Sequence, residues 1–454
     1  MRGADTLAQF NRVQKMVPAS NVKLITTGLA LTRLGAVWRF STALAYSGTV
    51  DEGELDGDLY IVGGGDPTIG AGVGCADTLG KSFSEWKALL DGAGIKSVRG
   101  RVIGDSRFFS RPSQGMTWQV EDLGYNYGAG PSGLNIFENS QTFTVAPSAE
   151  GEAPVITPLY PDTPWMDYVN SAVTGEAGSG NTLYYLNTDL APVGEFQGSF
   201  PVDRKESVLE CSNAFGAYTC AYLFHNYLIN NGVAVTGGYA DISPSGNIRC
   251  DLALAGTAPA AAQDSLVCLG TVKSPELRAI AKDTNYFSDN FYAETLFNML
   301  PSAVYGKADR RLSENAVKEI LAGMGLRPGN ACSIIDGSGL SRKDYVSPEF
   351  FVRFLRKMYA GSVRSAYVAS LPYPGSRSTL RYRMRKAPAD VKSRIRMKSG
   401  SMNGVLCFSG YILPEAGSGK QPVVFSILTN NVSGPASAVS SILDEIILSL
   451  ANEP

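Results

Sequence analysis

Two serine–lysine pairs in this sequence have a spacing that suits nucleophilic catalysis. Ser20 and Lys23 are three residues apart, and Ser84 and Lys87 repeat the same spacing. On a helix, residues three apart share one face, so the lysine amine can reach the serine hydroxyl. A lysine removes the hydroxyl proton only when its pKa falls from ~10.4 to near the working pH. The spacing alone does not choose between the two pairs.

The histidine content restricts which group can act as the base. The chain has a single histidine, His225, in a run of apolar and aromatic residues that predicts a packed helix. Serine and cysteine hydrolases usually take their base from histidine, and catalytic zinc usually needs histidine ligands. We therefore interpret His225 as structural and expect no metal site and no cofactor. A hydrolase with this sequence must use lysine or a carboxylate as its base.

The surroundings of the two pairs favour the first. The segment PASNVKLITTGLALTRLG predicts a helix that is entered through Pro18 and Ser20 and ends at Gly35, with apolar residues around much of its circumference. Burial disfavours the charged form of a lysine and so lowers its pKa, and a second nearby cation adds to this effect. The segment FSEWKALL, in contrast, predicts an ordinary surface helix. Ser20 and Lys23 are our candidate nucleophile and base.

Two further polar elements could complete such a site. Ser288 and Asn290 follow an aromatic pair and open the predicted helix DNFYAETLFNML, whereas the same Ser-x-Asn spacing at 179–181 and 245–247 lies in glycine-rich turns. Asp289, between them, is a candidate cap for this helix.

The last element is a lysine at the end of a strand. The run RIRMKSGSM predicts a strand by its alternation and ends in Lys398, Ser399, Gly400 and Ser401. The lysine can hold a substrate carboxylate, and the glycine lets a peptide approach the strand backbone. We interpret the basic run 381–398 as a solvated loop that leads into this strand, with Arg394, Arg396 and Lys398 on one face.

Composition and charge exclude several classes of partner and location. The 40 basic and 42 acidic residues give a net charge of −2, which argues against nucleic acid as the main partner. No run reaches the eighteen or so apolar residues of a transmembrane segment, and the first twenty residues lack a signal-peptide pattern. The seven cysteines have no metal-type spacing, and we interpret them as mostly buried free thiols rather than as disulfides such as Cys211–Cys220.

The distribution of predicted elements indicates an α/β (α+β) domain interrupted by a long β-rich insertion. Helical patterns at the start and after residue 274 are joined to two strand-like runs and a final amphipathic helix, while residues 40–260 hold mainly short β-rich runs and turns. We expect a catalytic domain of residues 1–40 plus 262–454, an inserted domain of 41–70 plus 140–261, and a second domain of 71–139 nested within it.

The three elements in this order resemble those of penicillin-binding proteins and serine β-lactamases. Five segments are similar to signatures of the low-molecular-mass class C penicillin-binding proteins, the D-alanyl-D-alanine carboxypeptidase and endopeptidase family. They are PASNVKLITTGLALTRLG, GDLYIVGGGDPTI, YFSDNFYAETL, IIDGSGLSR and RMKSGSMNGVLCFSGYI. The resemblance implies a transpeptidase-like fold with an antiparallel sheet and helices, and it explains the insertion, because this family carries two extra domains there.

The resemblance also implies roles for each element. Ser20 would be acylated by a peptidoglycan stem peptide ending in D-Ala-D-Ala or by a β-lactam, with Lys23 as base and Ser288 as proton relay. Asn290, Lys398, Ser399, Gly400 and Ser401 would bind the substrate. The family acts in the periplasm or cell envelope and normally has a leader and several dozen residues before this serine. We therefore expect that this chain starts internally and that its sheet lacks strands.

Alternative functions remain open at this level. A serine β-lactamase would need a dedicated base to activate water, for which no glutamate stands out. A non-catalytic muropeptide-binding module with the same fold would have no need of Ser20, Lys23, Asn290 and Lys398 together. The sequence does not choose between carboxypeptidase and endopeptidase activity.

Overall fold

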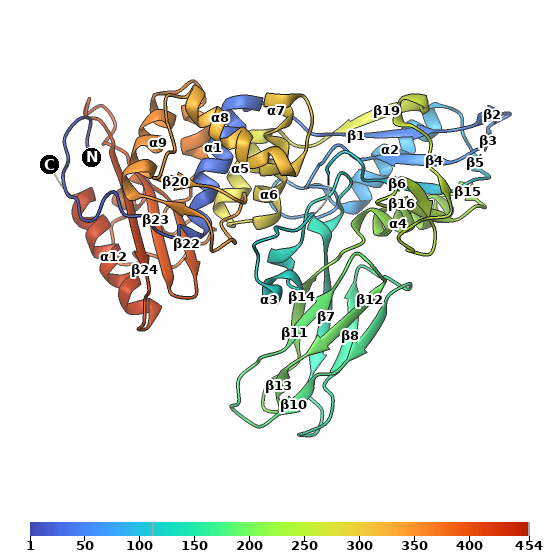
Figure 1. The fold of residues 1–454 in the computed structure, drawn as a ribbon, viewed down its shortest axis with the longest axis horizontal. Coiled ribbons are helices and arrows are strands. Elements are labelled where there is room, and N and C mark those ends of the chain that lie inside the picture. Colours follow the sequence, from blue (N-terminus) through green and yellow to red (C-terminus); the bar gives the residue numbers. More distant parts are fainter. Residues whose placement is uncertain (111–112, 453–454) are drawn as a thin grey trace. The chain divides into compact units, whose positions relative to one another are not determined.

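The computed structural model describes residues 1–110 and 113–452, which form two compact units (Figure 1). Unit 1 consists of residues 1–38 and 276–454, and unit 2 consists of residues 39–275. The predicted limits of the catalytic domain, 1–40 and 262–454, differ from this division mainly at the second junction. Residues 262–275 belong to unit 2 because they include strand β19 (Val267–Lys273), which pairs with β1 (Ser41–Tyr46).

Unit 1 is built on an antiparallel sheet with helices on both faces. The sheet has the order β22 (Ile395–Met402), β23 (Val405–Ile412) and β24 (Val423–Asn430), so β22 forms one edge. Helix α12 (Ala436–Ala451) covers one face, where Leu443 and Ile447 pack with Met397, Phe408 and Phe425 (Figure 1). On the other face, Tyr411 donates a hydrogen bond to the Leu355 carbonyl of α9 (Pro348–Ala360).

Several helices of unit 1 pack around α1 (Val22–Leu34), whose residues from Val22 to Leu31 are all buried. A short 3-10 helix, Ala19–Asn21, leads into α1, and Gly35 ends it with a φ of 93°. The predicted buried helix is confirmed. The other elements of the unit are α5 (Leu277–Tyr286), α6 (Asn290–Met299), α7 (Ser302–Tyr305), α8 (Ser313–Gly323), α10 (Arg364–Ala369), α11 (Ala389–Arg394), β20 (Cys332–Ser333) and β21 (Tyr345–Val346).

Unit 2 contains a seven-stranded sheet with two helices packed on it. The strand order is β18-β17-β16-β6-β4-β1-β19, and a four-stranded sheet has the order β15-β5-β3-β2. Helices α2 (Leu79–Gly92) and α4 (Gly216–Asn230) share one hydrophobic core with these strands. The bounds are β2 (Thr49–Asp51), β3 (Glu54–Asp56), β4 (Leu59–Val62), β5 (Ser97–Val98), β6 (Val102–Asp105), β15 (Ala234–Val235), β16 (Tyr239–Ile242), β17 (Asn247–Arg249) and β18 (Ala258–Pro259).

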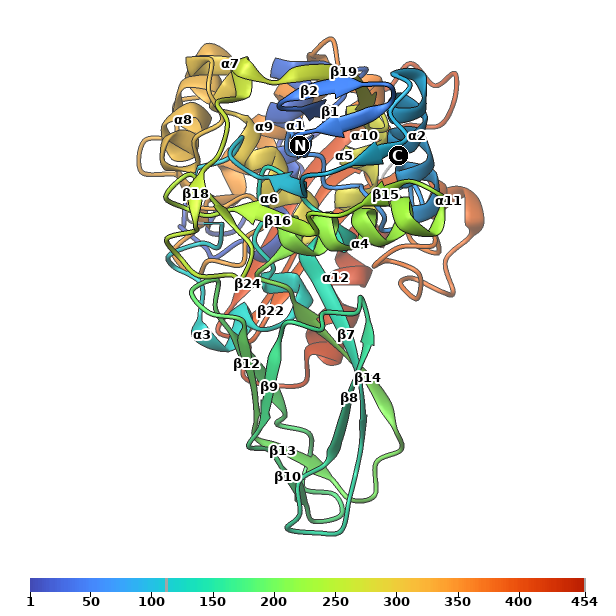
Figure 2. The same cartoon turned by 90° about the vertical axis from the view of Figure 1, so that its right-hand side faces the viewer.

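The middle of unit 2 forms a β-module with a core of its own. Figure 2 shows two three-stranded sheets, β14-β7-β8 and β11-β12-β9, facing each other, and Phe143, Tyr185 and Phe196 are buried between them. The elements are α3 (Val120–Leu123), β7 (Ser140–Ala146), β8 (Val155–Tyr160), β9 (Asp167–Asn170), β10 (Val173–Gly175), β11 (Tyr184–Asn187), β12 (Val193–Gln197), β13 (Ser199–Pro201) and β14 (Ser207–Ser212).

These cores bear on the predicted subdivision of the insertion. Phe83 and Trp86, which lie in the predicted nested domain 71–139, pack in the core of the large sheet, whereas residues 143–211 supply the separate core. The cores thus favour the β-module as the nested part, and the domain limits inside the insertion stay a prediction.

Within the described residues, no helix is both long and apolar enough to cross a membrane. The same part of the chain contains no group of three or more histidine, cysteine or acidic side chains that could hold a metal ion. All seven cysteines are free, and four of them are buried.

Candidate active site

Unit 1 brings the first serine–lysine pair together. Lys23 Nζ lies 3.0 Å from Ser20 Oγ, 2.6 Å from Asn290 Oδ1 and 2.8 Å from the Ser338 carbonyl oxygen. A neutral lysine amine has two N–H groups, which can donate to the Asn290 side-chain oxygen and to the Ser338 carbonyl oxygen. The lone pair of the amine is then free to accept from the serine hydroxyl. The geometry suits a base that takes the proton of Ser20.

Two glycines lie so close to the backbone around Ser20 that no larger residue would fit in their place. A Cβ on Gly400 would lie 3.0 Å from the Ser20 nitrogen and 2.8 Å from the Pro18 oxygen, and a Cβ on Gly339 would lie 2.0 Å from the Ala19 oxygen. We predicted that Gly400 makes room for a substrate peptide. The structure gives a more direct reason, since the turn that carries Ser20 itself lies against the glycine.

Two residues next to the reactive groups have strained backbones. Ala19 and Ser288 have φ values of 46° and 60°, in the left-handed region that non-glycine residues rarely adopt. Strain of this kind costs about 1–3 kcal/mol per residue and persists only where the surroundings enforce it. The surrounding structure therefore fixes the backbone of the Ser20 turn and of Ser288 in defined conformations.

Lys398 and Ser288 form the second half of the site. Lys398 Nζ lies 2.8 Å from Ser288 Oγ and also donates to the Ser399 carbonyl. Ser399 Oγ is 3.1 Å from Thr379 Oγ1, and the Ser401 side chain is exposed at the edge strand. The structure therefore places all eight predicted site residues, from Ser20 to Ser401, in unit 1, and hydrogen bonds link Ser20, Lys23 and Asn290 and, separately, Ser288 and Lys398.

Burial sets the proton affinity of both lysines, which are fully enclosed. Desolvation lowers the pKa of Lys23 to about 8, against the opposing effect of the carboxylates of Asp336, Asp289 and Glu294. Desolvation, followed by repulsion from Lys23, holds the pKa of Lys398 well below its usual range. We expected burial and a second nearby cation to lower the pKa of Lys23. Burial is its main cause, as expected, whereas the repulsion between the two lysines lowers the pKa of Lys398.

A buried carboxylate network behind Lys23 escaped the sequence analysis. Glu294 Oε1 accepts hydrogen bonds from the Gly337 and Ser338 backbone nitrogens at 2.9 and 2.8 Å, and its Oε2 lies 2.9 Å from Arg310 Nη1. Asp336 accepts from the Gly339 and Ser341 nitrogens, both at 2.7 Å. These bonds shape the loop that offers the Ser338 carbonyl to Lys23. A lone glutamate within the apolar run FYAETLFNML was the available signal.

The elements set aside on sequence grounds have ordinary structural roles. Ser84 Oγ donates to the Lys81 carbonyl on the exposed face of α2, and Lys87 forms an ion pair with Asp91 at 2.8 Å. His225 lies within α4 beside Asn226. Asp289 caps α6, because its Oδ1 accepts from the Tyr292 nitrogen at 2.8 Å. The predicted helices around Ser84 and His225 and the predicted cap at Asp289 are confirmed.

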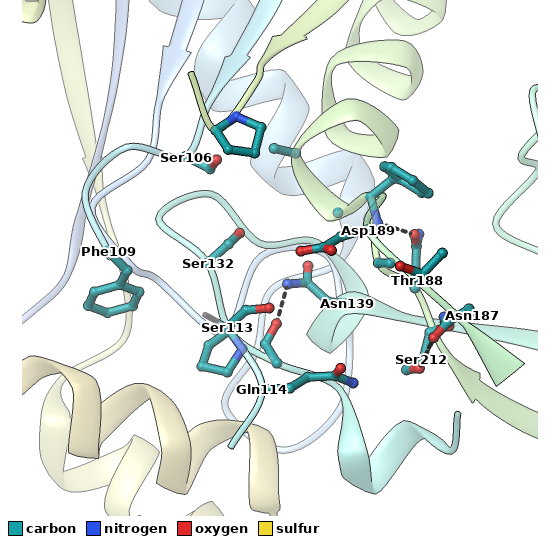
Figure 3. A pocket seen from close by; sticks show the side chains of 18 of the residues that line it. Ser106, Phe109, Ser113, Gln114, Ser132, Asn139, Asn187, Thr188, Asp189 and Ser212 are labelled. Atoms are coloured by element: carbon teal, nitrogen blue, oxygen red, sulfur yellow. Dashed lines mark hydrogen bonds between the residues drawn. The ribbon is translucent and has the colours of Figure 1, made fainter. Parts of the chain in front are cut away.

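A cavity of about 900 Å³ in unit 2 contains none of the predicted site residues. Figure 3 shows Ser106, Ser132, Asn139 and Asp189 among the side chains around it. Asn139 is held by the protein itself, since its carboxamide accepts from the Ile136 nitrogen and donates to the Gly130 carbonyl. The volume of a cavity is therefore a poor guide to the site in this chain.

Comparison with known proteins agrees with the arrangement in unit 1. The model of the D-Ala-D-Ala carboxypeptidase 3 (S13) family matches residues 2–450. A D-alanyl-D-alanine carboxypeptidase from an Actinomadura species is 32% identical over 96% of this chain and 77% of that protein. The penicillin-sensitive carboxypeptidase A of Dictyostelium discoideum is 24% identical over 97% of this chain and 83% of that protein.

The solved structures extend the comparison to the fold. Penicillin-binding protein 4 (DacB) from Haemophilus influenzae superposes with a TM-score of 0.79 at 24% identity, covering 98% of this chain and 92% of that one. A predatory endopeptidase from Bdellovibrio bacteriovorus, acylated by penicillin G, has a TM-score of 0.51 at 16% identity and covers 100% and 91%. The predicted penicillin-binding fold is confirmed. The chain belongs to the D-Ala-D-Ala carboxypeptidase 3 (S13) family and is a hydrolase of the serine peptidase class.

Proposed function

We propose that this protein cleaves the D-Ala-D-Ala bond of peptidoglycan stem peptides through an acyl-enzyme on Ser20. The observation that carries the proposal is the buried amine of Lys23, 3.0 Å from Ser20 Oγ and bound on its other sides by Asn290 and Ser338. Two relatives support the proposal by their names, since one is a D-alanyl-D-alanine carboxypeptidase and the other is a penicillin-sensitive carboxypeptidase.

In the proposed reaction, Lys23 takes the proton of Ser20 while Oγ attacks the carbonyl carbon of the penultimate D-alanine. The backbone N–H groups of Ser20 and Ser401 hold the developing oxyanion; one such donor is typically worth about 3–4 kcal/mol. The C–N bond then breaks, and a proton reaches the leaving amine through Ser288. Water hydrolyses the ester and regenerates the serine.

Lys398 has a binding role in this scheme. Its pKa is depressed because it is buried next to another lysine. A substrate carboxylate placed beside it favours the charged form, so we expect substrate binding to raise the pKa of Lys398. Ser399 and Ser401 supply hydroxyls for the same carboxylate, and Asn290 binds the substrate amide. Peptidoglycan lies outside the cytoplasm, so we also propose that the protein works in the cell envelope.

Labelling with a fluorescent penicillin tests the proposal. We expect the wild type and Ser84→Ala to carry the label and Ser20→Ala to carry none, since only Ser20 has a buried base. Mass spectrometry of the labelled protein should locate the adduct on the peptide that contains Ser20. A label that persists in Ser20→Ala and is lost in Ser84→Ala would refute the assignment.

A further inference from the structure

The loop behind Lys23 contains two buried aspartates that have no role in the scheme above. Strands β20 and β21 pair antiparallel and close the loop of residues 334–344 at its base. Asp336 and Asp344 lie near the two ends of this loop, and each is 1% exposed. The middle of the loop supplies the Ser338 carbonyl that accepts from Lys23 Nζ at 2.8 Å. The two aspartates therefore belong to the segment that positions one partner of the candidate base.

The two carboxyl groups have different hydrogen-bond partners. Both Asp336 oxygens accept backbone N–H groups, from Gly339 and Ser341, at 2.7 Å. Asp344 Oδ1 accepts from the Ile335 nitrogen at 2.6 Å, but no N–H or hydroxyl donor of the described residues reaches its buried Oδ2. The Asp344 carboxyl group is instead in hydrogen-bond contact with that of Asp336. Two carboxyl groups can form a hydrogen bond only if one of them carries a proton.

The contacts favour Asp344 as the residue that carries this proton. Two N–H donors at Asp336 stabilise a negative charge there, whereas Asp344 has one such donor. Burial, and after it the charge of Asp336, raise the pKa of the Asp344 carboxyl well above its usual range. The charge of Glu294 acts in the same direction, and Asp344 in turn acts on the buried Cys332 thiol. The hydrogen bonds and the surrounding charges thus agree on a neutral Asp344.

The charge of this pair of aspartates acts on Lys23. Burial lowers the pKa of Lys23, three carboxylates oppose this effect, and the largest of the three contributions comes from Asp336. The other ionisable groups that face the amine are Asp289, Glu294 and Lys398. A second negative charge at Asp344 would favour the protonated amine further, and a protonated amine cannot act as a base. A neutral Asp344 adds a hydrogen bond to Asp336 without adding that charge.

We infer that Asp344 is a positioning residue that retains a proton and donates it in a hydrogen bond to Asp336. This bond fixes the carboxylate that binds the backbone N–H groups of the loop, and so keeps the Ser338 carbonyl in place against Lys23. The pair acts with one negative charge rather than two. The inference rests on the proposed function and deepens it, because it names a residue that acts on the base without touching the substrate.

Infrared spectroscopy tests the proton directly. A carboxylic acid has a C=O stretching band that carboxylates and amides lack. The difference spectrum of the wild type minus Asp344→Asn, recorded at neutral pH, should contain this band. The matched control Asp390→Asn makes the same substitution at an exposed aspartate of α11, and its difference spectrum should lack the band. Absence of the band from the Asp344→Asn difference would overturn the inference.

The pH profile of penicillin acylation tests the effect on Lys23. In Asp344→Asn, the side-chain amide can accept from Ile335 and donate to Asp336, as the neutral acid does. This variant should keep the wild-type midpoint near pH 8 and most of the rate. Asp336→Asn removes a negative charge that acts on Lys23, so its midpoint should fall by about one pH unit. A similar fall in Asp344→Asn would indicate an ionised Asp344 and overturn the inference.

Removal of the donor tests the positioning role. Asp344→Ala cannot donate to Asp336, and the loss of a hydrogen bond to a charged group should slow acylation roughly ten- to hundredfold. Asp344→Asn, which restores the donor, should recover most of this loss. Equal acylation rates in the two variants would overturn the positioning role. If circular dichroism shows that Asp344→Ala is unfolded, the infrared band and the pH profile of Asp344→Asn decide the inference.

The outcomes separate this inference from the proposed function. Penicillin acylation of Ser20 together with a shifted pH profile in Asp344→Asn would overturn the inference and leave the proposed function standing. Absence of any Ser20 adduct in the wild type would overturn the proposed function, whereas an acid band that depends on Asp344 would still support the protonated pair.

Discussion

The chain contains the same Ser-x-x-Lys spacing on two helices with opposite properties. Lys23 is fully buried, contacts Ser20 and has its pKa lowered to about 8. The Lys87 side chain is 21% exposed and forms an ion pair with Asp91 at 2.8 Å, and Ser84 hydrogen-bonds back to its own helix. Identical spacing thus gives a candidate base in one place and a surface ion pair in the other, and desolvation and the available partners make the difference.

The largest effect should come from removing each lysine in turn. We expect Lys23→Ala to slow penicillin acylation roughly 10²- to 10⁴-fold, the usual contribution of a positioned general base. Lys87→Ala should acylate at the wild-type rate. Stopped-flow measurement with a fluorescent penicillin gives both rates, and circular dichroism checks that each variant is folded. An equal slowing in both variants would break the comparison.

The buried carboxylate network should matter for stability. Glu294→Ala removes the carboxylate that pairs with Arg310, and breaking a buried ion pair typically costs about 3–5 kcal/mol; it also removes the acceptor for the loop that holds Lys23. Urea unfolding measures the change in the free energy of unfolding. Glu85→Ala changes a partly exposed side chain of α2; it is the control and should change the free energy of unfolding by less than about 0.5 kcal/mol. A small change in Glu294→Ala would contradict a structural role for the network.

The pH dependence of acylation should follow Lys23. The reactive form is the neutral amine, and with a pKa of about 8 its fraction rises with pH. The acylation rate should therefore increase roughly tenfold between pH 7 and pH 9, as the neutral fraction of the amine rises from about 9% to about 91%. Lys87→Ala should show the same profile. A rate that is flat or falls over this range would rule out Lys23 as the titrating base.

The smallest effect should come from the exposed pair itself. Lys87→Ala removes an i,i+4 ion pair with Asp91 and should lower the free energy of unfolding by only about 0.3–0.5 kcal/mol. Thermal unfolding in low and high salt measures it, and salt should remove most of the difference. A loss of several kcal/mol would show that the two helices are less different than their exposure suggests.

The sequence predicted the secondary structure of the candidate site well because each of its elements is defined locally. The buried helix of Ser20, the helix that Asp289 caps, and the strand of Lys398 are set by periodicity and caps, and all appear where expected. The roles of Glu294 and of the loop at Ser338 were missed. Their contacts join residues far apart in the chain, and a buried glutamate in an apolar helix says nothing about which backbone it will bind.

The interior of the insertion was harder to predict for a similar reason. The β-rich character was clear from short runs and turns. The core of the β-module comes from residues 143–211, which lie between the two stretches of chain that supply the core of the large sheet. Strands such as β6 and β16 pair in parallel across more than a hundred residues, and no local pattern encodes that pairing.

The turn that carries Ser20 is closed against Gly339 and Gly400, segments that the chain delivers only after the whole insertion. Doubling the length of such an intervening loop costs only about 0.6 kcal/mol of closure entropy, so a large insertion is thermodynamically tolerable. The reactive serine nonetheless acquires its surroundings only when the beginning and the end of the chain have met. Covalent labelling by penicillin should therefore report on completed assembly of unit 1 and serve as a folding probe during refolding.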